Sequence, residues 1–209
     1  MIIGVGQYSE RVGEPGYEAL SYMDLAGRAL TAAIADSGAS GGVAQAIDTL
    51  AAIRAFEMSR PDRNPPFGAP DNVPRAIASR VGANPARAIL TTTGGQTNQQ
   101  LVGEFASAIA AGDSRCAVIV GSEAISTVLA LSAKGEIPDW WEEIGGDFED
   151  QGFGVEELLE PALFMHGASG AIPLYALAEN ARRHRLGLSL EEYRLEIGKL
   201  FAPFTEVAA

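Results

Sequence analysis

Few side chains in this sequence could act as a nucleophile. The only cysteine, Cys116, lies inside an apolar run, and a thiol buried among apolar groups is inert. Thr93 and Thr97 flank Gly94 and Gly95, but a hydroxyl without a strong base beside it is a weak nucleophile. No Ser-His-Asp order, Walker loop or His/Cys metal cluster occurs in the sequence. The residues alone therefore predict no catalytic group and no metal site.

The candidates for a general base are equally few. His166 precedes Gly167 in a glycine-rich loop just ahead of a predicted helix, and this position leaves both a ligand contact and a purely structural loop role open. His184 lies among arginines at the end of that helix, where we expect exposure to solvent. Glu123 follows a predicted strand, and the favoured interpretation is a hydrogen-bond anchor for neighbouring loops.

A pair of predicted strands would position these groups. Residues 89–93 and 116–120 are short apolar or β-branched runs. Because a predicted helix joins them, they imply a parallel pair with a right-handed crossover. The turn at Gly94 and Gly95 then lies at the carboxyl end of the first strand and faces the helix N-terminus. We expect a ligand there, since free N–H groups at a helix start bind anions and carbonyls.

The helix between the two strands is predicted to begin near Asn98. Thr97 and Gln100 have the spacing of a capping box. Apolar residues recur at helical spacing after it, and Gly112 predicts the end.

Three segments of this region resemble the nucleophile turn of the thiolase superfamily: TGGQTNQQLV, IAAGD and AVIVGSEAIST. In that pattern a cysteine heads the helix, and its place falls on Gly95. The likeness is to the acetyl-CoA acetyltransferase and sterol-carrier branch and its cysteine-less thiolase-like proteins. It covers nearly the whole chain, from IIGVGQ to YALAENARRHRLGLSLEEYRLEIGKLFAPFTEVA.

The resemblance implies an acyl-CoA-binding protein of the acyltransferase superfamily, with a role in lipid metabolism. It places the coenzyme A contacts at Gly94, Gly95, His166 and Gly167. The family's C-terminal half, which carries the catalytic histidine and second cysteine, is absent, so we expect no classical thiolase activity. A second thiolase half or a homo-oligomer is the partner that the resemblance implies.

The elements taken in order predict an α/β fold. Strands are expected at Ile2–Gln7 and Ile47–Phe56, and helices at Tyr22–Ser37 and from Asn72 to Val81. With the strands around the glycine turn, they predict a layered sheet covered by helices on both faces. The resemblance implies a mixed sheet whose fifth strand lies beyond this chain. We predict a boundary between a core, residues 1–129, and an incomplete, mostly helical loop domain, residues 130–209.

An acidic segment, Gly135–Pro161, marks the start of the second region. It carries two tryptophans and no Lys or Arg. The favoured interpretation is a solvated loop whose aromatic side chains pack on the core; the alternative is a non-catalytic interaction subunit that docks a partner through this segment. Its acidic residues are Glu136, Asp139, Glu142, Glu143, Asp147, Glu149, Asp150, Glu156, Glu157 and Glu160. Helices follow at Ile172–Arg185 and, after a Ser189–Glu192 capping box, to Phe201.

Composition excludes several classes of function. The 209-residue chain has a net charge of −12, which argues against nucleic acid and against anionic membrane surfaces. A single cysteine and the lack of a signal peptide indicate a reducing cytoplasm. A dinucleotide fingerprint is disfavoured, because its third glycine would fall on Ser9.

Overall fold

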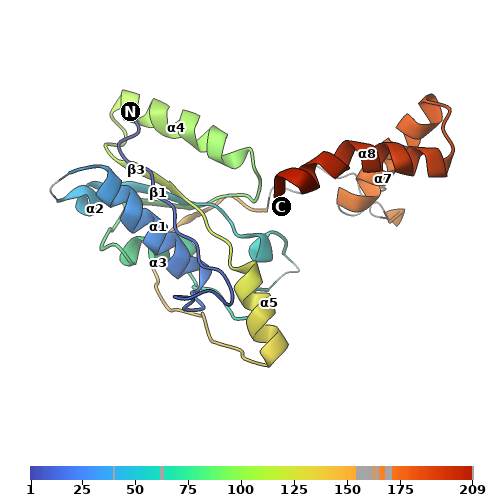
Figure 1. The fold of residues 1–209 in the computed structure, drawn as a ribbon. Helices are drawn as coiled ribbons and strands as arrows, with labels where there is room; N and C mark the ends of the chain where they lie inside the picture. The colour runs from blue at the N-terminus through green and yellow to red at the C-terminus, as the bar shows by residue number, and fades with distance from the viewer. Residues whose placement is uncertain (40, 62–63, 154–161, 163–164, 168–170, 209) are drawn as a thin grey trace. The chain divides into compact units, whose positions relative to one another are not determined.

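The computed structural model describes residues 1–39, 41–61, 64–153, 162, 165–167 and 171–208 (Figure 1). They belong to two units, Met1–Glu156 and Glu157–Ala209, which are treated separately below. Residues 130–153 are grouped with the first unit. The division into two domains at residue 129 stays a prediction. Glu156, Glu157 and Glu160 of the acidic segment lie outside the described residues.

A four-stranded sheet in the order β3-β1-β2-β4 forms the centre of the first unit. All of its pairs are parallel, so an antiparallel strand of a mixed sheet does not occur among the described residues. Thr49 stands opposite both Arg87 and Ala117. The strands are β1 (Thr49–Ala52), β2 (Arg87–Leu90), β3 (Ala117–Val120) and β4 (Glu149–Asp150).

Helices cover both faces of this sheet, as predicted. In Figure 1, α4 (Thr97–Ala111) lies on one side of the strands, and α1 (Tyr22–Asp36) and α3 (Val73–Ser79) lie on the other. The alternation of side chains along a strand explains the division. Leu50 of β1 belongs to the core cluster with α1 and α3, whereas its neighbour Ala51 packs with α4.

The starts of α1 and α3 have the caps that the sequence predicts. The Ser21 hydroxyl accepts a hydrogen bond from the Asp24 backbone N–H at 3.2 Å. The Asn72 side chain likewise accepts from the Arg75 N–H at 3.2 Å, with Pro74 in the first turn. Both caps satisfy N–H groups that have no partner inside the helix. They fix where the two helices begin beneath the sheet.

The strand predicted at Ile2–Gln7 is wrong, because residues 1–10 form no strand. Gly4 and Gly6 explain the difference. A Cβ at Gly4 would lie 2.1 Å from the Ala33 carbonyl oxygen, and one at Gly6 would lie 2.2 Å from that of Ala29. The two glycines thus let this segment run directly against α1 instead of pairing with a strand.

Three further elements belong to the first unit. They are α2 (Val43–Ala46), the 3₁₀ turn η1 (Phe56–Met58) and α5 (Ile125–Lys134). α5 buries Thr127, Val128 and Leu131, so it packs on the same unit as the sheet. The strand predicted at Ile47–Phe56 is shorter in the structure: it is β1, and the chain leaves the sheet after Ala52 and forms η1.

The acidic segment packs on the first unit as far as Asp150. Trp140 is buried and meets the Phe67 ring edge-on at 5.0 Å between centroids. The Asp71 carboxylate accepts a hydrogen bond from the Ile144 N–H at 2.8 Å. These contacts agree with aromatic packing on the core. Trp141, in contrast, is 55% exposed.

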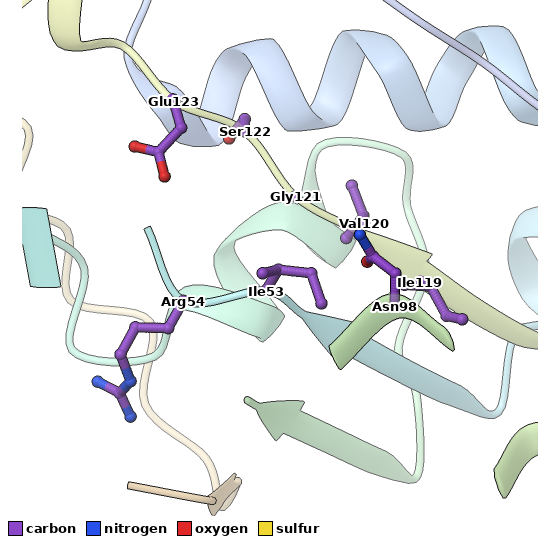
Figure 2. A pocket seen from close by; sticks show the side chains of 8 residues that line it. All are labelled: Ile53, Arg54, Asn98, Ile119, Val120, Gly121, Ser122 and Glu123. Atoms are coloured by element: carbon purple, nitrogen blue, oxygen red, sulfur yellow. The ribbon is translucent and has the colours of Figure 1, made fainter. Parts of the chain in front are cut away.

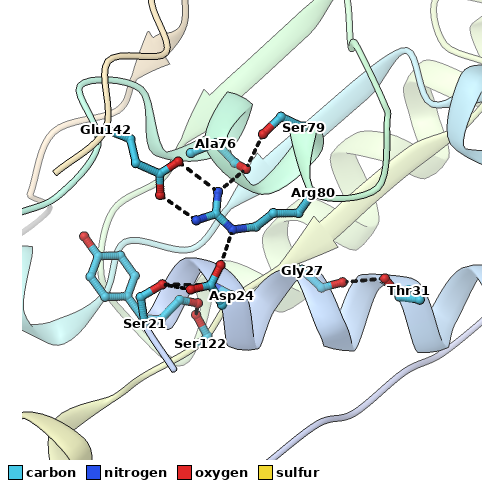
Figure 3. Close-up of polar contacts among 10 residues, drawn as sticks. Ser21, Asp24, Gly27, Thr31, Ala76, Ser79, Arg80, Ser122 and Glu142 are labelled. Atoms are coloured by element: carbon cyan, nitrogen blue, oxygen red, sulfur yellow. Dashed lines mark hydrogen bonds and ion pairs between the residues drawn. The ribbon is translucent and has the colours of Figure 1, made fainter. Parts of the chain in front are cut away.

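An ion-pair network attaches this segment to α1 and α3 (Figure 3). The Arg80 guanidinium lies between two carboxylates: Nε donates to Asp24 Oδ1 at 2.7 Å, and Nη2 donates to Glu142 Oε1 at 2.5 Å. Nη1 also donates to the Ala76 carbonyl oxygen at 2.7 Å. Arg80 therefore joins two helices and the acidic segment at one point.

The second unit contains α7 (Ala171–Arg185) and α8 (Leu190–Ala208). The Ser189–Glu192 capping box is present, with the Ser189 N–H donating to Glu192 Oε2 at 2.8 Å and the Glu192 N–H donating to Ser189 Oγ at 3.3 Å. The α8 helix continues beyond the predicted end at Phe201 and includes Pro203.

Candidate functional site

The carboxyl ends of the parallel strands meet at one edge of the sheet. Gly94 and Gly95 follow β2, Arg54 follows β1, and Glu123 follows β3. Because the three strands are parallel and adjacent, these groups follow the same edge of the sheet although they are far apart in sequence. This is the edge where ligands bind in α/β sheets.

The start of α4 differs from the predicted capping box. Gln96 is the N-cap residue, and no side chain caps the helix there. Thr97 is already helical and 3% exposed, and its hydroxyl lies 3.5 Å from the Thr92 carbonyl oxygen. The box is wrong because Gln96 has helical backbone angles, φ −75° and ψ −22°, which start the helix one residue earlier.

The two glycines of the turn differ in the space around them. A Cβ built on Gly95 would have no atom within 4 Å. At Gly94 a Cβ would approach the Gln96 side-chain amide to 2.6 Å. Gly95 therefore occupies an open position beside the first turn of α4, where a side chain would fit.

A cavity of about 360 Å³ lies at this edge of the sheet (Figure 2). It reaches the first turn of α4 through Asn98, and its lining is part apolar and part polar, without Gly94 or Gly95. Figure 2 shows the Asn98 and Glu123 side chains apart, with Ile53 between them. The lining residues are Ile53, Arg54, Asn98, Ile119, Val120, Gly121, Ser122 and Glu123.

Arg54 is a buried cation in this lining, with its side chain 6% exposed. Its guanidinium is ion-paired with Asp150, and Nε donates to the Thr91 carbonyl oxygen at 3.2 Å. The Phe153 ring lies 4.7 Å from the guanidinium carbon. Burial lowers the pKa of Arg54, while the Asp150 carboxylate opposes that shift. Arg54 thus holds the end of β4 against β1 and β2.

Glu123 is the acidic group of the cavity. Its Oε1 accepts a hydrogen bond from the Phe56 N–H at 2.8 Å. Burial raises the pKa of the Glu123 carboxyl, and the Phe56 hydrogen bond opposes that change. Glu57 is close enough that burial and the Glu123 charge raise its pKa as well. The hydrogen bond supports the interpretation of Glu123 as a loop anchor.

A smaller cavity of about 120 Å³ lies against the same strand end. It shares Gly121, Ser122 and Glu123 with the larger one. Its other lining residues come from the N-terminal segment, α1 and α5: Tyr8, Ser9, Glu10, Leu25, Ala29, Ala124, Ser126 and Thr127. Glu123 therefore borders both cavities.

The remaining sequence candidates belong to different parts of the chain. Cys116 precedes β3, at the amino end of the sheet, and burial together with the Asp48 charge raises its pKa. Thr93 follows β2, and its hydroxyl donates to the Arg54 carbonyl oxygen at 3.2 Å. His166, Gly167 and His184 are exposed residues of the second unit. The coenzyme A contacts expected at His166 and Gly167 stay predictions.

Two observations concern other classes of site. In the ranges that the structure describes, no group of three or more His, Cys, Asp or Glu side chains could hold a metal ion. Among the described helices, none is long and apolar enough to cross a membrane.

Sequence reasoning missed Arg54 and Asn98 as lining residues. A signal for Arg54 was present, because it is a lone cation two residues beyond a buried strand. Asn98 gave none, since a polar residue in the first turn of an amphipathic helix is ordinary.

The chain is similar to a protein of known structure. A solved SCP2-thiolase-like protein type 1 from Mycobacterium smegmatis, described as monomeric, is 36% identical to the chain with a TM-score of 0.62. The match covers 99% of this chain and 34% of that protein, so the chain spans about a third of its length. No protein-family model and no curated protein matches the chain.

Proposed function

Because the chain has a thiolase-like fold, we propose that it binds an acyl-CoA thioester at the Gly94–Gly95 turn without forming an acyl-enzyme. The observation that carries the proposal is Gly95. It occupies the place that the family pattern gives to the nucleophilic cysteine, at the start of α4 and the carboxyl end of β2. It has no side chain that could take an acyl group.

The cavity supports this proposal. Its volume of about 360 Å³ lies in the range of small-molecule sites. Ile53, Ile119 and Val120 offer an apolar surface for a short acyl group. The first turn of α4 brings backbone N–H groups that have no partner within the helix, and these favour a carbonyl or phosphate oxygen.

Several finer points belong to the same proposal. His166 and Gly167 are further proposed contacts of coenzyme A. A second thiolase half, or a further copy of this chain, would complete any acyltransferase chemistry in lipid metabolism. The cytoplasm is the compartment in which acyl-CoA would be available to it.

The test is to restore the thiol with Gly95→Cys. A cysteine at a helix N-terminus has a lowered pKa and is reactive as the thiolate, and the open space around Gly95 admits its side chain. We expect labelled acetyl-CoA to acetylate the variant at residue 95, as seen by intact mass and peptide mapping. The wild-type chain should bind acetyl-CoA in equilibrium dialysis and remain unlabelled.

Gly103→Cys is the matched control. Gly103 lies on the same helix and also has no atom within 4 Å of a Cβ, but it is in the middle of α4. Its thiol should react with iodoacetamide at the rate of an ordinary cysteine. Equal acetylation of both variants, or a labelled wild-type residue near Gly95, would refute the proposal.

The alternative function, docking of a partner through the acidic segment, has one observation in its favour. Trp141 is exposed while its neighbour Trp140 is buried. Deleting the whole segment would remove Trp140 and Glu142, which stabilise the first unit. Trp141→Ala is the cleaner test: loss of a partner with acetyl-CoA binding unchanged would favour this alternative.

A further inference from the structure

The polar side chains of the larger cavity differ in whether their hydrogen-bonding groups are already engaged. Ser122 donates to the Tyr22 carbonyl oxygen, and Arg54 is held by Asp150 and two backbone carbonyls. Glu123 uses Oε1 for the Phe56 N–H, and its Oε2 has no hydrogen-bond partner among the described residues. One carboxyl oxygen therefore remains for a ligand.

The same geometry determines the charge of that carboxyl. Glu123 is bordered by two cavities and by the apolar side chains of Ile53 and Val120. Glu123 is exposed over part of its surface, but its carboxyl is partly desolvated where it lies against the cavity lining. This desolvation raises its pKa above that of a fully solvated glutamate. A neutral carboxyl with one oxygen accepting from Phe56 presents its O–H on the other side.

We propose that the protonated Glu123 carboxyl donates a hydrogen bond to the carbonyl oxygen of the bound thioester. The inference rests on the function proposed above and adds a group that distinguishes acyl-CoA from coenzyme A itself. The carbonyl is the only acceptor that acetyl-CoA has near the sulfur and that coenzyme A lacks. Glu123 is then a binding residue that selects the thioester, in addition to anchoring the loop at Phe56.

The charged and titratable groups around Glu123 set the sign of the pH dependence. Glu57 on η1 and Glu10 on the N-terminal segment are acidic, Tyr22 on α1 is a buried phenol, and Arg54 is the nearby cation. Arg54 is already neutralised by Asp150. The Glu57 and Glu123 charges repel each other, which favours the neutral form of Glu123. Thioester binding should therefore be strong at low pH and weaken as the pH rises.

The experiment compares three ligands by equilibrium dialysis across pH 4.5 to 8.5 on the full chain. Acetyl-CoA carries the carbonyl, S-ethyl-CoA has a thioether in its place, and coenzyme A has neither. We expect acetyl-CoA to bind about tenfold more tightly than S-ethyl-CoA at the acid end, as one hydrogen bond gives. The advantage should disappear as the pH rises.

Glu123→Gln separates this role from a structural one. Its amide keeps an acceptor for Phe56 and a donor for the carbonyl, so acetyl-CoA should keep its advantage at every pH. Glu57→Gln removes a neighbouring negative charge and should move the pH midpoint of the wild-type advantage downward. Glu136→Gln, an exposed carboxylate on the same unit, should leave the profile unchanged.

The outcomes distinguish the inference from the proposed function. If coenzyme A and both derivatives bind equally at all pH values, the role of Glu123 is wrong and acyl-CoA binding stands. If the profile falls with pH in Glu123→Gln as in the wild type, another group donates and the inference is again wrong. If none of the three ligands binds, both the function and the inference are overturned.

Discussion

The two faces of the sheet are covered to very different depths. On one face, α1 and α3 pack with Leu50, Leu90 and Trp140 into a large cluster of buried apolar residues. On the other face, the cluster of buried apolar residues in the described chain contains Ala51, Ile89, Leu101 and Phe105. Along α4, Val102 and Ile109 are exposed, and Glu104 is the only charged residue.

The two faces therefore differ in how much apolar surface this chain buries on each. A helix that is almost uncharged on its outer side is typical of one covered on both sides. The second thiolase half proposed above would add most burial if it covered the α4 face. The larger cavity borders the face with the smaller apolar cluster, because Asn98 in the first turn of α4 lines it. The candidate site thus borders the face that this chain covers least.

The largest change in unfolding free energy is expected when a buried leucine is replaced by alanine, and each face of the sheet offers one such leucine. Leu50→Ala removes a side chain that is 0% exposed in the large cluster, and we expect a loss of roughly 3 to 5 kcal/mol of unfolding free energy. Leu101→Ala removes one that is 1% exposed beneath α4. There we expect about 2 kcal/mol, because the thin layer can relax into the space. Urea denaturation measures both.

Equal losses at the two leucines would contradict the comparison. A larger loss at Leu101 would mean that α4 is the more tightly packed helix. Adding a partner half, if one is found, should raise the cost of Leu101→Ala and leave that of Leu50→Ala unchanged.

A smaller change in unfolding free energy is expected at the ion-pair network of Arg80, which lies on the face covered by α1 and α3. Arg80→Met removes the group between Asp24 and Glu142 and should cost about 1 to 2 kcal/mol, since two carboxylates lose their charged partner. Arg87→Met, whose guanidinium is 39% exposed beside Glu104 and Glu149, is the matched control and should cost less. Thermal unfolding that ranks Arg87 above Arg80 would contradict this expectation.

The same network predicts how stability depends on pH. Burial alone would raise the pKa of Asp24, but hydrogen bonds from Ser21 and Arg80 outweigh it and lower that pKa. The stability that Asp24 contributes is therefore present above the ordinary aspartate pKa of about 3.9 and is lost as the pH falls through the lower folded value. Asp24→Asn should flatten the acid limb of a stability–pH curve. An unchanged limb would show that Asp24 has the same pKa in the unfolded chain.

The smallest effect is expected from two glycines, one for each face. Gly6→Ala places a methyl group against the Ala29 carbonyl oxygen and should cost about 1 kcal/mol as the N-terminal segment moves off α1. Gly95→Ala meets no atom within 4 Å and should change stability by less than about 0.5 kcal/mol. Destabilisation by Gly95→Ala would mean that the start of α4 requires glycine for its backbone.

Local signals predicted most of the first unit. Ser21 with Asp24 and Asn72 with Arg75 are caps made within a few residues, so periodicity and capping fix α1 and α3. The thiolase-like α/β fold is confirmed by the parallel sheet with helices on both faces and by the structural match. The errors arise where a contact between residues far apart in sequence determines the local structure. The apolar residues 2–7 suit a strand, but the close fit of Gly6 to α1 is invisible in sequence.

The site was predicted less completely than the fold. The glycine turn after β2 could be placed, because a strand, two glycines and a helix follow one another. The cavity could not be placed, since Arg54, Asn98 and Glu123 come together only when β1, β2 and β3 align in parallel. Thr97 also shows the limit of a local rule. Its spacing to Gln100 fits a cap, yet Gln96 starts the helix.

The order of strands in the sheet also constrains how the chain is synthesised and folded. The central strand, β1, is the first to leave the ribosome, but its neighbours β2 and β3 follow only after α3 and α4. Non-local parallel pairing of this kind folds slowly, and an unpaired apolar strand invites aggregation. Until Val120 has been synthesised, β1 lacks one of its two partners, so the nascent chain passes through a stage at which a chaperone would find an exposed strand to bind.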